Sequence, residues 1–403
     1  MSISPMQNER PTSLAPDVAA DLVAMRRHLH ANPELSNEER GTQAYLLERI
    51  GLAGIGGAKP AAGTGVVVDI EGRQRPSNRC VLVRADIDAL PIHEDTGLDF
   101  ASRTPGVMHA CGHDAHTAMA FAAMRSLHRL RDSFSGTVRF VFQPAEEAEP
   151  LGGRRIVGEG WLNGVEAAIG IHVDPYMETG KVAVGEGPFT LAADSFDITV
   201  SGVAAHAAKP HEGTDALEIG CAIVAALNRI AGRETGPFEA SALSVTRFLA
   251  GQSYNVLADR AAISGTFRSG GEATRARGLR RIEEIATGIA AAHGASADVR
   301  IVRGEPPVVN DAAMVRVVAD AATACLGEGA LVIASGWEAA DDFGFYSERV
   351  PSVYFRLGVR DPAATEAYPL HHPRMNVDEN ALIPGAETLI ASALAALELP
   401  RGE

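Results

Sequence analysis

Short apolar runs alternate with segments of helical periodicity along the first 187 residues of this chain. Strands and helices in alternating order are typical of a mainly parallel sheet flanked by helices. The same character returns near the C-terminus, where we expect a strand at 351–357 and a helix at 382–399. The predicted strands of the first part are 65–71, 80–86, 137–143 and 167–172, and the predicted helices are 17–31, 36–51, 114–131 and 153–163.

The middle of the chain follows a different order. From residue 194 the pattern predicts a strand, a helix, two strands, a second helix and a last strand. This β-α-β-β-α-β order is that of a ferredoxin-like sandwich. We therefore predict a discontinuous α/β domain with a mixed, mainly parallel sheet, formed by residues 1–187 and 304–403. An α+β domain of residues 188–303 interrupts it. The inserted strands are expected at 194–201, 240–249, 258–268 and 296–303, and the helices at 214–232 and 272–293.

Charge and cysteine content exclude several classes of protein. The formal net charge is −15, which disfavours binding to nucleic acid. No apolar stretch reaches about 18 residues, so no membrane span is expected. The N-terminal residues lack the basic and apolar regions of a signal peptide. The four cysteines are widely spaced, which favours a reducing, cytoplasmic setting.

The densest cluster of reactive side chains is Met-His-Ala-Cys-Gly-His-Asp-Ala-His at 108–116. It directly precedes the predicted helix at 114–131. Cysteine and histidine are ligands of borderline-soft divalent ions, so this cluster indicates a metal site. Two alternatives remain open from the residues alone. The segment could be a polar loop that is rich in histidine, or Cys111 could be the nucleophile of a cysteine hydrolase.

Three further elements supply ligand-type side chains. Glu146 and Glu147 follow an apolar strand, at the end where α/β sheets place their sites. Two adjacent carboxylates repel each other unless a cation neutralises them. One of them could bind the metal while the other takes a proton from water. His172 ends another apolar strand, and the pair His371-His372 comes late in the chain. This inventory predicts a two-ion site with a general base.

With these motifs the chain resembles the N-acyl-amino-acid amidohydrolase family, which includes hippurate hydrolases and auxin-conjugate (indole-acetyl-amino acid) hydrolases. That family belongs to the dinuclear metallopeptidases and aminoacylases. The resemblance runs from about residue 25 to about residue 383. Its landmarks are RADIDALPI (84–92), MHACGHDAH (108–116), VFQPAEE (141–147), GIHV (170–173), GQSYNVLADRAAISGTFR (251–268) and LHHPRMNVDE (370–379).

The resemblance implies a role for individual residues. Cys111 would bridge two metal ions as a thiolate, and Glu146 would be the general base. His371 is preferred to His372 because the family motif is Leu-His-x-Pro. Asp86 and Asp88 would orient the ligands. The implied metal ligands are Cys111, His113, Glu147, His172 and His371.

The inserted domain also carries implied site residues. His206 matches a substrate-binding histidine of the family, although Ala-Ala-His-Ala stands here in place of a Gly-Gly-His-Ala-like motif. The resemblance implies that this histidine reaches the substrate across a homodimer. Asn255 and Arg268 would lie near the substrate carboxylate, which the planar fork of an arginine suits.

The implied activity is hydrolysis of the amide bond of a small N-acyl amino acid to a carboxylic acid and a free amino acid. The implied cofactors are two divalent ions, Mn²⁺ first, with Zn²⁺, Co²⁺ and Ni²⁺ as alternatives. Removal of an acetyl group from a diaminopimelate-type precursor, or hydrolysis of an aromatic amine, would use the same site. A non-catalytic metal-binding scaffold is a further alternative, which the spare carboxylate of Glu146 disfavours.

Overall fold

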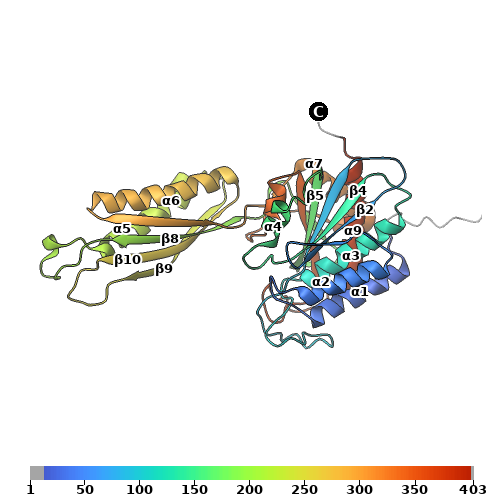
Figure 1. Cartoon of the computed structure of the whole chain (residues 1–403), viewed down its shortest axis with the longest axis horizontal. Coiled ribbons are helices and arrows are strands. Elements are labelled where there is room, and N and C mark those ends of the chain that lie inside the picture. Colours follow the sequence, from blue (N-terminus) through green and yellow to red (C-terminus); the bar gives the residue numbers. More distant parts are fainter. Residues whose placement is uncertain (1–12, 401–403) are drawn as a thin grey trace, which may run out of the picture. The chain divides into compact units, whose positions relative to one another are not determined.

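The chain divides into two compact units in a computed structural model that describes residues 13–400 (Figure 1). The first unit contains the described residues up to Gly187 together with Asn310–Ser335 and the chain from Phe345 onward. The second unit contains Pro188–Val309 and the short segment Gly336–Gly344. This segment joins the second unit through backbone bonds, since Leu191 donates to Ala339 at 2.8 Å.

The first unit is built on a mixed sheet with the strand order β1-β2-β4-β3-β5-β14-β6-β13. The central strands β4, β3, β5 and β14 run parallel, whereas β1 and β2 join one edge antiparallel. The prediction of a mainly parallel mixed sheet is confirmed. The strands are β1 (Lys59–Ala61), β2 (Gly65–Glu71), β3 (Cys80–Asp86), β4 (Thr137–Gln143), β5 (Ala167–Glu178), β6 (Val182–Val184), β13 (Leu331–Ile333) and β14 (Ser352–Arg360).

Helices α3 and α9 pack against β3, and each also contacts a second helix, α1 beside α3 and α7 beside α9 (Figure 1). Glycine at position 385 allows α3 and α9 to approach closely. A Cβ there would lie 2.2 Å from the sulfur of Met119 in α3. The helices are α1 (Pro16–Ala31), α2 (Arg40–Leu52), α3 (His113–Arg129), α4 (Gly152–Gly158), α7 (Ala312–Leu326), α8 (Gly344–Ser347) and α9 (Leu382–Glu398).

The stretch Glu379–Glu398, which includes α9, is long and apolar enough to cross a membrane by length and composition alone. In the structure it behaves as a core helix. Leu389, Ile390 and Ala393 are fully buried in the same hydrophobic core as α3 and the sheet. Its apolar character is therefore accounted for by packing within the first unit.

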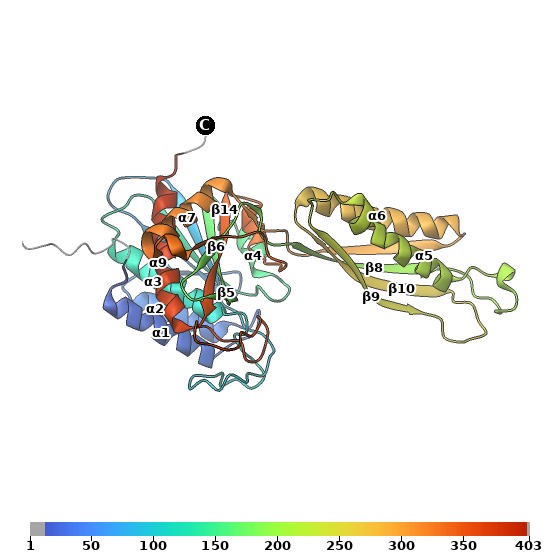
Figure 2. The ribbon, with the colours of Figure 1, turned by 180° about the vertical axis from the view of Figure 1, so that it is seen from behind.

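The second unit is an antiparallel sheet with the strand order β11-β8-β10-β9, and both of its helices lie on one face of that sheet (Figure 2). Phe196, Ile263 and Phe267 fill the core between the layers. The ferredoxin-like arrangement predicted from the element order is confirmed. The elements are β8 (Ala192–Ser201), α5 (Ala216–Arg229), β9 (Ser241–Ala250), β10 (Arg260–Ser269), α6 (Glu272–Ala292) and β11 (Ser296–Arg303). The short strands β7 (Gly187–Pro188) and β12 (Val309–Asn310) lie where the chain passes from one unit to the other.

The parallel strands determine where polar side chains gather in the first unit. Strands β3 and β4 run in the same direction, and Asp86 at the end of β3 lies beside Gln143 at the end of β4. Helix α3 begins at the same edge, because Thr117 in its second turn donates a hydrogen bond to the carbonyl of Asp86 at 2.8 Å. The segments that carry the predicted metal ligands therefore meet at one edge of the sheet.

Candidate metal centre

The predicted ligands Cys111 and His113 flank Gly112, the residue that directly precedes α3. Gly112 between them has a φ of 82°. A Cβ at this position would lie 2.5 Å from a methyl carbon of Val173, so only glycine fits the turn. The turn presses this loop against β5, and the sulfur of Cys111 lies 3.4 Å from Nε2 of His172.

The five predicted ligands fall into overlapping groups of donor atoms. Cys111, His113 and His172 form one group, in which all three donor atoms lie within 4.8 Å of one another. Cys111, Glu147 and His371 form a second group by the same criterion. The two groups share Cys111, the residue for which the family resemblance implies contact with both ions.

The surroundings of one buried ring nitrogen, Nε2 of His113, indicate whether these residues suit a metal. Nε2 of His113 is buried and has no hydrogen-bond partner among the described residues. The nearest carboxylate oxygens belong to Asp86 at 3.6 Å and Glu147 at 4.0 Å. A buried nitrogen without a partner is costly unless something absent from the protein chain binds it. The donor set of one thiol, three imidazoles and one carboxylate fits borderline divalent ions.

Asp88 fixes the orientation of His113. Nδ1 of His113 lies 2.9 Å from the backbone carbonyl of Asp88 and 3.2 Å from its carboxylate. The same carboxylate accepts hydrogen bonds from the Ser36 hydroxyl at 2.7 Å and the Glu147 backbone N–H at 3.0 Å. Asp88 therefore holds two of the predicted ligand segments in register, as expected for a residue that orients ligands.

Asp86 lies in a buried network that includes His116, a residue to which the sequence analysis gave no role. Asp86 contacts Nη1 of Arg84 at 2.6 Å and Nδ1 of His116 at 2.6 Å. Nε2 of His116 accepts a hydrogen bond from the backbone N–H of Val173 at 2.9 Å. His116 thus connects β3 to the residue that follows His172. Its position in the 108–116 cluster was the only signal in the sequence.

The carboxylates of this region change the proton affinities of the ligands. Burial raises the pKa of the Cys111 thiol well above its usual value, and the charges of Glu147, Glu146 and Asp86 raise it further. Burial alone would lower the pKa of His113, but Asp86, Asp88 and Glu147 raise it to about 10. Burial, together with the charge of His116, lowers the pKa of His172 well below its usual value. Without a metal, both shifts favour the protonated forms of Cys111 and His113.

Glu146 and Glu147 follow a tight turn after β4. Ala145 has a φ of 49°, an unusual conformation for a residue other than glycine. The carboxylate of Glu39 accepts a hydrogen bond from the Ala145 backbone N–H at 2.7 Å and so supports the turn. The carboxylates of Glu146 and Glu147 lie within 4.8 Å of each other and of a ring nitrogen of His113. Glu39 was not anticipated, because it lies far from this motif in the sequence.

The two late histidines point in different directions. His371 has a φ of 64°, and its backbone N–H donates to the carbonyl of Ala110 at 2.9 Å. Nε2 of His371 lies 3.1 Å from the carboxylate of Glu147. His372 instead stacks on Tyr368, with ring centroids 4.7 Å apart. The structure therefore brings His371, rather than His372, to the predicted ligands.

The three predicted substrate residues lie in the second unit and are not all close together. The backbones of His206 and Val256 form an isolated bridge, which places His206 near Asn255, and both side chains are exposed. Arg268 pairs with Ala193 near one end of β10. Arg260 lies at the other end of β10, which is the end of the sheet nearer to His206. Within one chain, Arg268 is thus separated from His206 and Asn255 by the length of a strand.

Comparisons with known proteins cover most of the chain. The model of the peptidase family M20/M25/M40 matches residues 82–395. The chain is 41% identical over 305 residues to an N-acyl-L-amino acid amidohydrolase of Geobacillus stearothermophilus, which covers 76% of this chain and 82% of that protein. It is 37% identical over 372 residues to the N-acetyl-L-cysteine deacetylase of Bacillus subtilis, which covers 92% of this chain and 87% of that protein.

A solved structure shows the same architecture. The crystal structure of the Bacillus subtilis YXEP protein, described as a dinuclear metal binding peptidase from the M20 family, superposes with a TM-score of 0.83. The two chains are 33% identical, and the match covers 95% of this chain and 99% of that one. The similarity therefore extends over both compact units.

Proposed function

Since this chain belongs to the peptidase M20/M25/M40 family, we propose that it is a metal-dependent amidohydrolase that cleaves the amide bond of N-acyl amino acids. The observation that carries the proposal is the pair of donor groups that share Cys111, with the carboxylate of Glu146 beside them. A site that only binds metal would not need a further carboxylate at this position. Two relatives have names that describe the hydrolysis of an amide, and they support the same reaction.

We assign the five ligands as two overlapping sets. Cys111, His113 and His172 would hold one divalent ion, and Cys111, Glu147 and His371 the other. When bound, such ions polarise the substrate carbonyl and lower the pKa of water toward neutrality. The family resemblance favours Mn²⁺, and Zn²⁺, Co²⁺ and Ni²⁺ suit the same donors. Asp86 and Asp88 hold the ligands in place through the contacts described above.

Glu146 moves the proton in this mechanism. Its carboxylate accepts a proton from the water molecule whose oxygen attacks the carbonyl carbon of the amide. The same proton then passes to the amide nitrogen as the carbon–nitrogen bond breaks, so that a carboxylic acid and a free amine are released. His206 is proposed to stabilise the negative charge on the carbonyl oxygen, and Asn255 and Arg268 to bind the carboxylate of the amino acid.

The separation of Arg268 from His206 within one chain supports a role for a second chain. We propose a homodimer that docks through the second unit, residues 188–303. Strand β9 is the edge strand of its sheet, and Leu249 on this strand is 52% exposed. An unpaired edge with exposed apolar side chains suits pairing with an identical edge. The proposed partners are therefore a second copy of the chain and a small-molecule substrate.

The related activities differ in the acyl group and in the amino-acid side chain of the substrate. Hippurate-like and indole-acetyl-amino-acid-like conjugates are the first candidates, and N-acetyl amino acids are the second, which the deacetylase relative favours. We expect the enzyme to work in the cytoplasm, where its cysteine thiols would stay reduced. The deciding assay follows product formation by the metal-loaded protein with benzoylglycine, N-acetylcysteine, an N-acetylated diamino acid and an anthranilate-type amide.

Chelation and substitution separate this proposal from its rivals. A metal amidohydrolase loses turnover in chelator and regains it when Mn²⁺ is added back. A cysteine hydrolase would keep its turnover in chelator and would be inactivated by a thiol reagent. A non-catalytic scaffold would bind metal and release no product from any of the substrates. Activity that survives complete removal of the metal would overturn the proposed function.

A further inference from the structure

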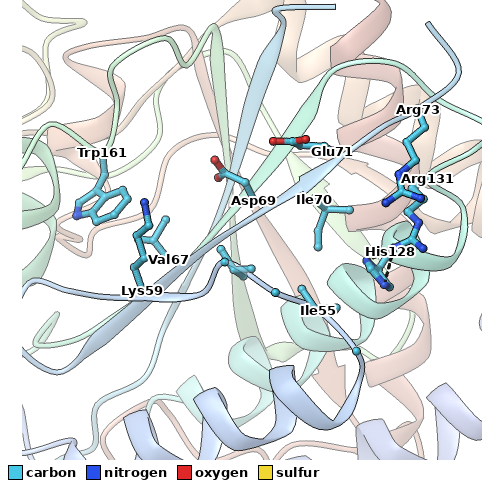
Figure 3. A pocket seen from close by; sticks show the side chains of 14 residues that line it. Ile55, Lys59, Val67, Asp69, Ile70, Glu71, Arg73, His128, Arg131 and Trp161 are labelled. Atoms are coloured by element: carbon cyan, nitrogen blue, oxygen red, sulfur yellow. Dashed lines mark hydrogen bonds between the residues drawn. The ribbon is translucent and has the colours of Figure 1, made fainter. Parts of the chain in front are cut away.

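A cavity of about 490 Å³ lies in the first unit, between the loop Gly54–Gly57 and the outer edge of β2 (Figure 3). This volume is in the range of sites for small molecules. None of the predicted ligands, and neither of the adjacent glutamates, lines this cavity. It is therefore separate from the candidate metal centre, and the proposed mechanism gives it no role.

One wall of the cavity is a strand edge that is only partly paired. Strand β1 pairs with β2 at Gly65–Val67, and among the described residues no strand pairs with the rest of this edge. The residues Val68, Asp69, Ile70 and Glu71 of β2 all line the cavity. Backbone groups on this side of β2 are thus available to a ligand.

The opposite wall is a loop in which three of the four residues are glycine, with Ile55 as the fourth. Gly54 and Gly57 have φ values of 73° and 81°, which favour glycine. A Cβ built at Gly54, Gly56 or Gly57 would meet no atom within 4 Å. Packing within the protein therefore does not explain Gly56, whereas a ligand that lies close to the backbone would.

Positively charged side chains lie together at one end of this cavity. Figure 3 shows Arg73, Arg131 and His128 side by side at that end, with Lys59 and Trp161 at the other. Among the described residues, neither Arg73 nor Arg131 forms an ion pair with a carboxylate. Arg131 donates to the ring of His128 at 2.9 Å. Burial lowers the pKa of His128, and the charges of Arg131 and Arg73 lower it further, so this histidine is neutral and accepts that bond.

The acidic residues of the cavity do not neutralise these arginines. Asp69 is already paired with Arg139, which contacts both of its oxygens at 2.8 Å. Glu71 is exposed and forms no ion pair with the described residues. Lys59, Arg73 and Arg131 therefore leave an excess of positive charge in a chain whose formal net charge is −15. Such a local excess attracts anions.

We propose that this cavity binds a small metabolite through a carboxylate or phosphate group held by Arg73 and Arg131. An arginine presents a planar fork that can make two parallel bonds to either group. The body of the ligand would extend along the β2 edge, with the glycine-rich loop Gly54–Gly57 on its other side. Carboxylate and phosphate share the oxyanion chemistry that the site recognises, and separate titrations distinguish them.

The test is calorimetric titration of the metal-loaded protein with sodium phosphate and, separately, with sodium succinate, at a constant ionic strength of about 0.15 M. The titrations use the unmodified chain, the double variant Arg73→Gln/Arg131→Gln and the control Arg40→Gln/Arg300→Gln. Arg40 and Arg300 are exposed and lie outside the cavity, so the control removes the same charge elsewhere. Any binding of these anions at the metal centre is common to all three proteins.

We expect at least one of the two anions to bind the unmodified chain and the control at one saturable cavity site, with a dissociation constant of about 1 mM or lower. Binding to that site should weaken at least about tenfold in the double variant. If the double variant fails to fold, the single variant Arg73→Gln replaces it in the titrations, because it changes an exposed side chain. The proposal is overturned if neither anion shows this site, or if the arginine variants bind as tightly as the control.

Discussion

Nδ1 of His113 lies 2.9 Å from the backbone carbonyl of Asp88 and 3.2 Å from its side-chain carboxylate. Because both of these groups accept hydrogen bonds, Nδ1 carries the proton. Nε2 is then the nitrogen that faces the other candidate metal ligands. This arrangement determines which ring nitrogen would bind the metal.

The first prediction concerns Asp88. Asp88→Ala removes the carboxylate that orients His113 and also binds the backbone of Glu147, so we expect metal affinity to fall about 10–100-fold. The affinity is measured by competition with a chelator of known strength. Asp95→Ala is the control, because Asp95 is exposed and is not among the predicted ligands. Equal affinities in the two variants would mean that Asp88 does not position the ligand.

The second prediction separates the adjacent glutamates. Glu146→Gln should retain both ions and lose about 10²–10⁴-fold in kcat, because glutamine cannot accept the proton of water. Glu147→Gln should instead lose metal, with partial recovery of activity at high metal concentration. Elemental analysis and kcat of both variants are the measurements. Loss of metal from Glu146→Gln, with full occupancy in Glu147→Gln, would reverse the two assignments.

The third prediction concerns protons released by the metal. The pKa of His113 is raised to about 10 and that of Cys111 is raised well above its usual value, so both are protonated at pH 7 in the metal-free chain. Their ligand forms are deprotonated, whereas His172 is already neutral because its pKa is lowered. Metal binding should therefore release about two protons at pH 7, and affinity should rise with pH until both ligands are deprotonated in the metal-free chain.

The proton count is obtained by calorimetry in buffers that differ in ionisation enthalpy. The variant Cys111→Ser should lower the count by about one, since the serine hydroxyl is not expected to ionise at this pH. An unmodified chain that releases no protons on binding metal would contradict the assignment of both residues as ligands.

The fourth prediction tests the contact between α3 and α9. A Cβ at Gly385 would lie 2.2 Å from the sulfur of Met119, so Gly385→Ala should lower the free energy of unfolding by about 1–3 kcal/mol. Gly288→Ala in α6 is the matched control, because a Cβ there meets no atom within 4 Å. That change should be neutral or raise the free energy by about 0.5–1 kcal/mol. Denaturant titrations of both variants measure the difference.

The fifth prediction concerns the proposed dimer. Leu249→Glu places a charge on the edge strand β9, where leucine is 52% exposed, and should shift the chain from dimer to monomer. Val302→Glu on the opposite edge strand β11, where valine is 39% exposed, should leave the dimer intact. Light scattering gives the mass of each variant. An unmodified chain that is monomeric and fully active would contradict the dimer.

The regular elements were the most predictable part of the fold. The strands 65–71, 80–86 and 137–143 agree with β2, β3 and β4 to the residue, because each is a compact apolar run between turns. The helix predicted at 153–163 ends at Gly158 instead, since the Gly-Trp-Leu-Asn-Gly stretch that follows forms turns. The short strands β1, β6 and β13 were not predicted, because three residues carry too little periodicity to identify a strand.

The candidate site was predictable where it is local in sequence. Cys111 and His113 stand out within one motif, and Glu146 and Glu147 are adjacent. The supporting residues His116 and Glu39 could not be assigned, because their roles depend on contacts with Val173 and Ala145, which are remote in the chain. Tertiary hydrogen bonds of this kind leave no periodic signal in a single sequence. The cavity beside β2 could not be predicted either, because the segments that line it are also far apart in the sequence.

The pairing of β5 with β14 has a consequence for synthesis of the chain. Ala168 pairs with Ser352, and the whole second unit lies between these two residues in the sequence. As the chain leaves the ribosome, the contiguous stretch Pro188–Val309 can collapse first, because it contains its own core. The central sheet cannot be completed until its last parallel strand, β14, has emerged, and His371 emerges after that strand. We therefore expect nascent chains to acquire their full metal affinity only after His371 has left the ribosome.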